Sequence, residues 1–296
     1  MELIRRGKVK EVYAVDEERL LFVFTDKISV FDKIIPSKIP YKGETLCKTS
    51  AFWFKKLNEM EIKNHYISCK GNKMEVNRFK IIDNPKEKDE NYLIPLEFIT
   101  RYYVAGSMYD RLKSGKMDYR EIGFSTMPKY GEPLPEPYFE ITTKFEAYDR
   151  KVNFKEAREI GGLRQEEIED IKELILKIDE IMEEEVKKRG LIHVDGKKEF
   201  ALGEGREIFV VDTFGTMDED RWWDKEEYDR GNIVQLSKEF VRQYYRDIGY
   251  YQKLKEAREK GLEEPEIPPL PLEMIRKVSK LYVDMYGRIT GKKLKI

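Results

Sequence analysis

The sequence predicts an α+β protein with two lobes, an N-terminal lobe rich in antiparallel strands and a larger C-terminal α/β lobe. Three observations predict this fold class. Residues 1–40 contain short apolar runs of strand length, separated by charged or turn residues. Apolar residues at helical spacing recur in the second half. The length of 296 residues exceeds one typical domain, and we expect the boundary to separate residues 1–92 from residues 93–296.

The overall composition excludes several classes of protein. The net charge is −1, which does not indicate a strongly basic nucleic-acid surface. No apolar run approaches membrane-spanning length, and the segment MELIRRGKVK lacks the apolar region of a signal peptide. The only cysteines, Cys47 and Cys69, and the only histidines, His65 and His193, predict neither a disulfide framework nor a zinc site. We therefore expect a soluble, cytoplasmic protein with no nucleic-acid or membrane partner.

The expected N-terminal sheet begins with the runs ELIRRG, EVYAVD and RLLFVFTD. Gly7 opens the stretch GKVKEVY, in which Lys8 and Lys10 occupy alternating strand positions. Both amines would then point to the same side, where a strand and turn of this kind can cover phosphates. A solvated strand face is the alternative interpretation.

A helix from Glu44 to Leu57 is expected next, with Phe52, Trp53 and Phe54 on its core face together with its last residue. The segments HYISC and MEVNRFKII then predict two further strands. These elements complete the expected N-terminal lobe.

The segment LIPLEFITRYYVAG, residues 93–106, predicts a strand that crosses from one lobe to the other. Pro95 interrupts its start, as expected at a hinge or an edge. Arg101 follows an apolar run, and Ser107 is the expected N-cap of a short helix, SMYDRLKSG. A guanidinium group beside a helix N-terminus is suited to bind a phosphate. Alternatively, Ser107 only caps the helix and Arg101 makes a surface ion pair.

Residues 127–150 are rich in proline and aromatic residues and show no periodicity. We expect a long loop here, and loops of this length are often functional. Lys144, Glu146 and Asp149 are the candidates for substrate contact within it.

Three helices are expected beyond this loop. The helix from Gln165 to Gly190 carries a stripe of mostly isoleucine residues at three- and four-residue steps. A second helix over residues 238–256, with Ser237 as its N-cap, and a third over residues 272–290 follow.

The stretch from Asp195 to Asp224 places acidic residues inside predicted strands. The runs KKEFAL and EIFVVD flank a loop that contains two glycines, which is typical of a β-hairpin. Lys197 and Glu199 would share one face, and the hairpin can bring Asp212 onto the same face. Opposed carboxylates are tolerable if a cation such as nucleotide-bound Mg²⁺ lies between them. A hairpin face with solvated charges is the alternative interpretation.

Several of these stretches resemble, in order and spacing, one family across nearly the whole chain. They are GKVKEVY at 7–13, FTDKISVFD at 24–32, LIPLEFITRYYVAGS at 93–107, DGKKEF at 195–200 and DEDRWWD at 218–224. The family is the SAICAR synthetases (phosphoribosylaminoimidazole-succinocarboxamide synthases) of purine biosynthesis. The resemblance implies an ATP-dependent ligase with an ATP-grasp-like nucleotide cleft between the two lobes. Such a ligase joins the carboxylate of carboxyaminoimidazole ribonucleotide to the amine of L-aspartate and forms SAICAR, ADP and phosphate.

The resemblance also implies a role for individual residues on the nucleotide side. Lys8 and Lys10 of the N-terminal lobe, and Lys197 of the hairpin, would contact the phosphates of ATP. Glu199 and Asp212 would hold Mg²⁺, and together with the hairpin lysine they form the expected catalytic group. The strand that begins at residue 93 would line the adenine pocket with backbone groups.

On the acceptor side, the resemblance implies that Arg101 and Ser107 bind the 5′-phosphate of the ribonucleotide. Asp218 and Arg221 would contact the rest of the ribonucleotide. Lys144 would neutralise a substrate carboxylate.

The chain departs from the family pattern, which indicates a divergent member. Thr213 replaces a glutamate, Ala201 and Tyr41 replace glycines, Tyr148 replaces a histidine and Lys27 replaces an arginine. One extra residue also precedes the DEDRWWD segment. A related ATP-dependent carboxylate–amine ligase with another acceptor, and a nucleotide-binding regulatory protein without turnover, are therefore alternative hypotheses. A homo-oligomer is compatible with the sequence.

Overall fold

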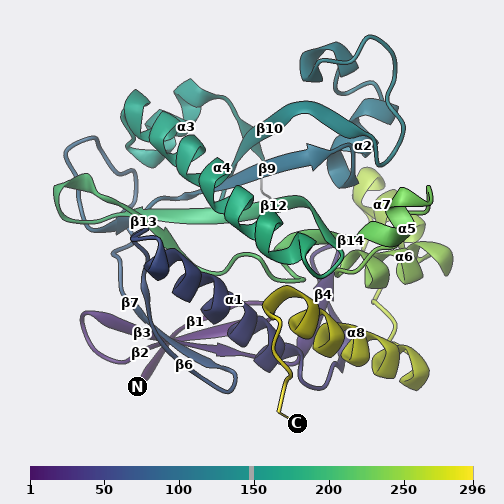
Figure 1. Ribbon diagram of the computed structural model, residues 1–296, viewed down its shortest axis with the longest axis horizontal. Coiled ribbons are helices and arrows are strands. Elements are labelled where there is room, and N and C mark those ends of the chain that lie inside the picture. Colours follow the sequence, from purple (N-terminus) through teal and green to yellow (C-terminus); the bar gives the residue numbers. More distant parts are fainter. Residues whose placement is uncertain (147–149, 296) are drawn as a thin grey trace.

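The computed structural model describes residues 1–146 and 150–295 and shows a mixed α+β fold (Figure 1). The N-terminal sheet is antiparallel and has the order β1-β2-β3-β7-β6. Its strands are β1 (Glu2–Arg6), β2 (Lys10–Ala14), β3 (Arg19–Phe24), β6 (Tyr66–Lys70) and β7 (Lys73–Asn77). A separate hairpin joins β4 (Lys27–Val30) to β5 (Lys33–Lys38). The antiparallel strands expected here are confirmed, although the last one ends earlier than the run MEVNRFKII predicts.

Helix α1 (Lys42–Glu59) packs against this sheet and against the C-terminal helix α8 (Leu272–Thr290) (Figure 1). The expected core face is confirmed for Trp53, Phe54 and Leu57, which are buried, whereas Phe52 is partly buried. Tyr41 precedes the helix with φ of 66°, in the left-handed region. Glycine adopts positive φ without steric cost, so a tyrosine at this position is strained.

The larger sheet has the order β11-β10-β9-β12-β13, and β8 and β14 also pair with β12. Its strands are β8 (Tyr92–Leu93), β9 (Leu96–Tyr103), β10 (Pro133–Thr143), β11 (Lys151–Val152), β12 (Leu191–Leu202), β13 (Ile208–Val211) and β14 (Asp220–Asp224). Helices α3 (Phe154–Gly161) and α4 (Gln165–Lys187) pack on it (Figure 1). Pro95 lies in the break between β8 and β9, as expected.

The expected loop over residues 127–150 is wrong at its centre, because Pro133–Thr143 forms β10. Three of the four prolines that suggested a loop lie between Pro133 and Tyr138, where the pairing with β9 shifts in register. On its other side β10 pairs with β11 only at Ile141 and Thr142. The prolines therefore avoid the regular part of the ladder, in which a missing N–H would remove a hydrogen bond.

Two helix boundaries differ from the predictions. Helix α2 (Gly106–Lys113) has Ala105 as its N-cap, so Ser107 lies inside the helix and does not cap it. The helix expected over residues 238–256 is two helices, α6 (Glu239–Asp247) and α7 (Tyr250–Lys260). Gly249 separates them with φ of 74°, a conformation that ends a helix. The short segments η1 (Tyr119–Ile122), η2 (Glu204–Arg206) and α5 (Lys225–Asp229) complete the described elements.

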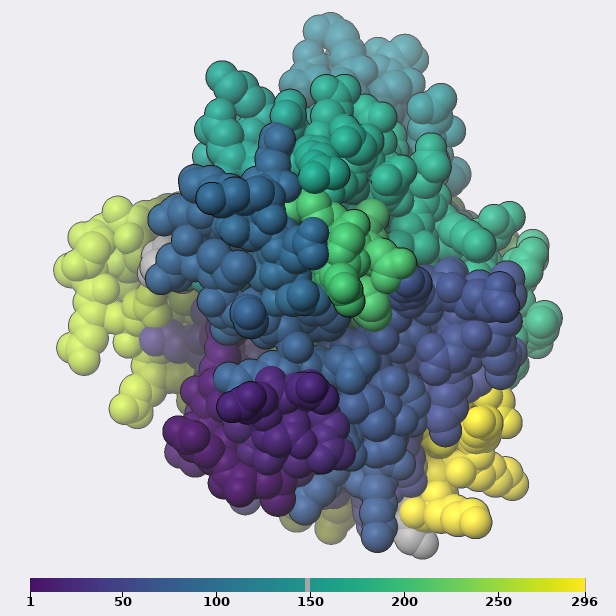
Figure 2. All heavy atoms as spheres, turned by 90° about the vertical axis from the view of Figure 1, so that its left-hand side faces the viewer, coloured from purple at the N-terminus to yellow at the C-terminus, as the bar shows by residue number. Residues whose placement is uncertain are grey.

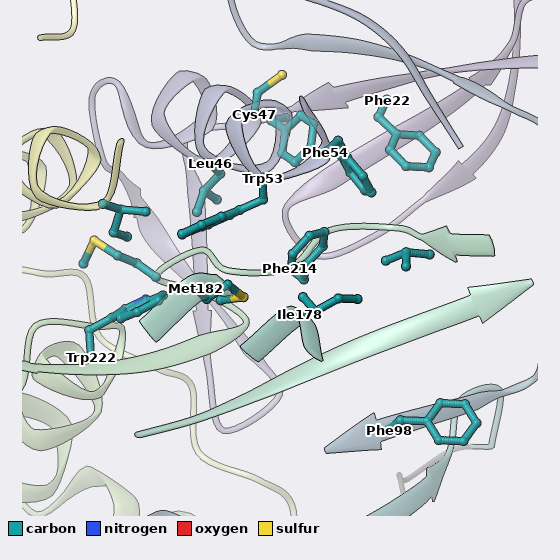
Figure 3. Packing of buried hydrophobic residues seen from close by; sticks show 14 of the residues in the cluster. Phe22, Leu46, Cys47, Trp53, Phe54, Phe98, Ile178, Met182, Phe214 and Trp222 are labelled. Carbon is teal, nitrogen blue, oxygen red and sulfur yellow. The ribbon is translucent and has the colours of Figure 1, made fainter. Parts of the chain in front are cut away.

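A continuous apolar core joins the two sheets through α1. Phe54 of α1 packs edge-on against Phe214, with ring centroids 5.3 Å apart. Figure 3 shows Trp53 and Phe54 pointing from α1 toward Phe214, Met182 and Ile178. Figure 2 shows the outer shape, with the purple N-terminal strands below the teal and green segments of the larger sheet and its helices. Within the described residues, no helix has the length and apolar character needed to cross a membrane.

Candidate active site

The predicted site residues line two pockets. The larger pocket, of about 1600 Å³, is lined by Lys8, Lys10, Lys144, Lys197, Glu199, Asp212 and Asp218. The smaller pocket, of about 320 Å³, is lined by Arg101, Ser107, Lys197, Asp218 and Arg221. The two pockets share Lys197, Asp218 and Glu219 in their walls and therefore adjoin. The fold thus brings together residues that lie more than 200 positions apart in the chain.

The hairpin of β12 and β13 forms as expected and positions the acidic pair. Glu199 pairs with Val211 in the ladder, and Asp212 follows β13 with φ of 61°. Lys144, at the end of β10, contacts Glu199, and its Nζ lies 3.4 Å from Oδ2 of Asp212. Lys10 of β2 contacts the other carboxylate oxygen of Asp212. One ammonium group therefore bridges the two acids, so both carboxylates are within reach of a single cation.

Burial and neighbouring charges set the protonation of this cluster. Burial opposes ionisation of Asp212, but the ammonium groups of Lys10 and Lys144 outweigh it and hold the pKa of Asp212 well below its usual range. Burial lowers the pKa of Lys144 to about 8, and the nearby lysines Lys197 and Lys10 act in the same direction. Asp212 is therefore charged at neutral pH, whereas the pKa of Lys144 lies close to it.

Lys197 lies where the two pockets meet and is surrounded by acids. Its Nζ is 2.5 Å from Glu97, 3.4 Å from Glu199 and 3.5 Å from Glu219. Burial opposes its charge, but Glu219 and Glu97 outweigh burial and raise the pKa of Lys197. Sequence reasoning missed Glu97 and Glu219. Glu97 precedes Phe98 in the largely apolar strand β9. A buried acid within an apolar strand is unusual, and this was the sequence signal that could have identified Glu97.

The two lysines of the GKVKEVY stretch both line the larger pocket but have different partners. Lys8 precedes β2 and its Nζ lies 2.5 Å from Asp32, at a half-exposed position. Lys10 is more buried and contacts Asp212. Both residues line the larger pocket, and their contact with phosphates stays a prediction.

Arg101 and Arg221 meet at one carboxylate in the smaller pocket. Both donate to Oδ2 of Asp195, and for Arg101 the distance is 3.1 Å. Arg101 also donates to Oγ of Ser107 at 3.3 Å. Arg101 is only 6% exposed, so its interpretation as a surface ion pair is wrong. A Cβ at Gly106 would lie 2.5 Å from Nη2 of Arg221, so only glycine lets that guanidinium approach α2 so closely.

Asp218 is held by three groups that the sequence did not suggest. Lys42, fully buried at the start of α1, donates to Oδ2 at 2.8 Å. The hydroxyl of Tyr282 on α8 donates to Oδ1 at 2.5 Å, and Nζ of Lys238 lies 3.6 Å away. Burial opposes ionisation, but the two lysines outweigh it and keep the pKa of Asp218 well below its usual range.

Two buried hydrogen bonds to Gly215 hold the loop that contains Thr213 in place. Nε1 of Trp53 donates to the carbonyl oxygen of Gly215 at 3.0 Å, and the Gly215 N–H donates to Asp220 at 2.6 Å. The other oxygen of Asp220 lies 2.7 Å from Nε2 of His193. Thr213 lines the larger pocket, and its Oγ1 lies 3.4 Å from Glu219.

Glu146, a further candidate of the 127–150 segment, does not join this site. Glu146 is exposed, pairs with Arg150 at 2.9 Å and lines neither pocket. Asp149 and Tyr148 lie outside the described residues.

Comparison with known proteins identifies the class to which this fold and site correspond. The family model described as SAICAR synthetase matches residues 3–257. The chain therefore belongs to the SAICAR synthetase family, and the family expected from the motifs is confirmed.

Individual relatives agree with this assignment. The chain is 58% identical to the phosphoribosylaminoimidazole-succinocarboxamide synthase of Thermoplasma acidophilum, over 99% of this chain and 100% of the relative. It matches the SAICAR synthase of Saccharomyces cerevisiae complexed with SAICAR with a TM-score of 0.77 and 27% identity, covering 100% and 97% of the two chains. A type-2 SAICAR synthetase in complex with ADP matches with a TM-score of 0.72 and 27% identity, covering 99% of each.

Proposed function

We propose that the chain is an ATP-dependent carbon–nitrogen ligase of purine biosynthesis. It joins the carboxylate of carboxyaminoimidazole ribonucleotide to the amine of L-aspartate and forms SAICAR, ADP and phosphate. The observation that carries this proposal is that the motif residues converge on two adjoining pockets. The proposal is also supported by the 58% identity that the chain shares, over 99% of its length, with a phosphoribosylaminoimidazole-succinocarboxamide synthase.

ATP binds in the larger pocket, between two lobes that divide near residues 92 and 93. Lys8 and Lys10 reach this pocket from the N-terminal side and Lys197 from β12. Three ammonium groups around one space suit a triphosphate, because they spread the charge that develops on the transferred phosphoryl group. The ADP complex of a relative supports the same nucleotide chemistry.

The donor set at Glu199 and Asp212 fits Mg²⁺. Magnesium in nucleotide sites is usually held by one or two carboxylates together with substrate phosphates, so a larger protein cage is not required. Lys144 already bridges both carboxylates, so the two acids lie close enough to share one cation. In residues 1–146 and 150–295, no cluster of three or more metal-ligating side chains competes with this pair. When bound, the metal supplies positive charge to the phosphates of the nucleotide.

The ribonucleotide binds in the smaller pocket, with its 5′-phosphate at Arg101, Ser107 and Arg221. The Nε atoms of both arginines are buried and donate no hydrogen bond to the described part of the chain. Planar guanidinium groups match phosphate oxygens well, and Asp195 holds the two groups side by side. Asp218 lies between the pockets and contacts the remainder of the ribonucleotide.

The junction of the pockets is where the carboxylate is activated and the amine attacks. A carboxylate is a poor electrophile, so ATP must first phosphorylate its oxygen or an equivalent step must occur. A neutral amine then attacks the activated carbonyl carbon. Lys144 neutralises a substrate carboxylate next to the acidic pair, and Lys197 stays charged to hold the phosphates.

A coupled assay for ADP release tests this function directly. Purified protein with ATP, Mg²⁺, the ribonucleotide and L-aspartate should release ADP only when both acceptor substrates are present. Turnover with another amino acid in place of aspartate would identify a related ligase, a result that Thr213 in the pocket wall makes worth testing. Nucleotide binding without any turnover would indicate the regulatory protein and overturn the proposal.

A further inference from the structure

Cys47 and Cys69 lie against each other although they are 22 residues apart in the chain. Their sulfur atoms are 3.4 Å apart, and both are free thiols. Cys47 belongs to α1 and is fully buried, whereas Cys69 belongs to β6 and is partly exposed. Neither residue lines the pockets described above. The pair is therefore a feature separate from the proposed active site.

The surroundings give the two thiols different accessibility. Strand β6 is at the edge of the N-terminal sheet, and its neighbouring residues Ser68 and Lys70 are exposed. Cys69 is itself partly exposed on this edge strand, so a small reagent can reach it. Figure 3 shows Cys47 on the side of α1 that points away from Trp53 and Leu46. The helix is held at the same strand by Phe54 and Tyr66, whose stacked rings lie 5.9 Å apart.

We propose that Cys47 and Cys69 form a reversible redox site, in which a low-molecular-weight disulfide oxidises the two thiols to an intramolecular disulfide. The partly exposed Cys69 reacts first and the buried Cys47 resolves the mixed disulfide. This site is independent of the ligase function proposed above.

The exchange is balanced in two steps. The thiolate of Cys69 attacks one sulfur of the small disulfide, and the other sulfur leaves as a thiolate that takes up the proton lost by Cys69. The sulfur of Cys47 then loses its proton and attacks Sγ of Cys69, releasing the second small thiol. Overall, two protons and two electrons pass from the protein to the small disulfide, which becomes two thiols.

Electrostatics favours this order of attack. The hydrogen bond from Cys47 lowers the pKa of Cys69 against the effect of burial, and Lys48 and Lys55 lower it further, while Glu44 opposes them. The same hydrogen bond and burial raise the pKa of Cys47. The accessible sulfur is thus the better nucleophile.

The oxidised form would tie the edge strand to the central helix. Because a disulfide restricts the unfolded chain, closing a loop of this length should raise the Tm by roughly 5–10 °C. Since α1 also carries Lys42 and Trp53, the link would hold the helix that contacts Asp218 and Gly215. We expect turnover to change little, because the helix and strand already touch in the reduced state.

Incubation of the full chain with glutathione disulfide, followed by maleimide labelling under denaturing conditions and intact mass spectrometry, tests the proposal. We expect a product without label and lighter by two hydrogens, which dithiothreitol converts back to a form with two labels. The Cys47→Ser variant should stop at one glutathione adduct on Cys69. The folded Cys69→Ser variant should stay unmodified, because its remaining thiol is buried.

Two results would overturn the proposal. The first concerns conditions under which Cys47→Ser acquires its glutathione adduct. If the wild-type chain keeps both thiols under those conditions, or ends as a glutathione adduct, no intramolecular disulfide forms. The other is a Tm of the oxidised wild type equal to that of the reduced form. The double serine variant provides the matched control, since its Tm should not respond to the oxidant.

Discussion

At the scale of single residues, Lys144 is the most informative side chain in the larger pocket. Its ammonium group touches two carboxylates, Glu199 and Asp212, in a buried setting. Burial and the neighbouring lysines bring its pKa to about 8, although the charge of Asp212 acts in the opposite direction. Its charge therefore depends on pH within the working range of an enzyme, unlike that of an ordinary lysine.

The lowered pKa of Lys144 predicts that kcat/KM falls on the alkaline side of its pH profile. The lowered pKa means that Lys144 is charged below about pH 8 and neutral above it. If the charged form neutralises a substrate carboxylate, kcat/KM should fall as pH rises through this value. Arginine stays charged, so Lys144→Arg should move this alkaline limb of the profile to higher pH. Steady-state kinetics from pH 6 to 10 measure both profiles, and an unmoved limb in the variant would exclude Lys144 as the titrating group.

A second prediction concerns the metal-binding role of Asp212. Asp212→Asn removes a charge but preserves size, so it should reduce ADP release by roughly 100-fold or more and raise the Mg²⁺ concentration needed for half-maximal rate. Asp229→Asn is the control, because its carboxylate pairs with Lys225 on the exposed face of α5. Unchanged ADP production by Asp212→Asn would show that the metal assignment is wrong.

At the scale of elements, the start of α1 contains a strained residue. Tyr41 adopts φ of 66° and is 40% exposed, so its side chain contributes little to the core. Tyr41→Gly should raise the free energy of unfolding by about 0.5–1 kcal/mol, because glycine removes the strain of positive φ but loses more entropy on folding. Denaturant titration measures the change. Tyr41→Ala keeps the strain and should give no gain, and a less stable glycine variant would contradict the prediction.

The loop after β13 depends on a contact from α1. Trp53→Phe removes the N–H that binds the carbonyl oxygen of Gly215 and leaves that oxygen unpaired, at a cost of about 1–3 kcal/mol. Because this loop joins Asp212 to Asp218, turnover of the folded variant should fall as well. Trp222→Phe is the matched control, since its equally buried Nε1 makes no hydrogen bond to the part of the chain that the structure describes. Equal effects of the two variants on turnover would argue against a role for the contact.

At the scale of the whole molecule, the apolar core continues from one sheet into the other. Phe22 and Met74 of the N-terminal sheet belong to the same buried cluster as Phe98 and Phe200 of the larger sheet. We therefore expect the full chain to unfold in one cooperative transition, and residues 1–92 alone not to fold. Calorimetry of the chain and circular dichroism of the fragment test this. A stable fragment would show that the proposed lobes are independent domains. A homo-oligomer stays a prediction.

Much of the local structure could be predicted from the sequence. Helix α8 has the predicted bounds, and the hairpin of β12 and β13 forms around Gly203 as expected. The secondary structure predicted from residue patterns was wrong at the prolines of β10 and at Gly249. The prolines before Tyr138 are tolerated because the pairing there is irregular, and Gly249 divides a helix whose apolar pattern continues across it.

The sequence by itself determined the family and predicted a part of the candidate site, because motif residues and their spacing are local properties. Only the tertiary structure decided how these residues pair. Asp218 meets Lys42 from a position 176 residues away, Lys144 bridges two acids of the hairpin, and Cys47 touches Cys69. Such contacts carry no local signal, because core packing between sheets and helices sets the distance between residues remote in the chain. Their pKa values follow from the same packing, which determines both burial and neighbouring charge.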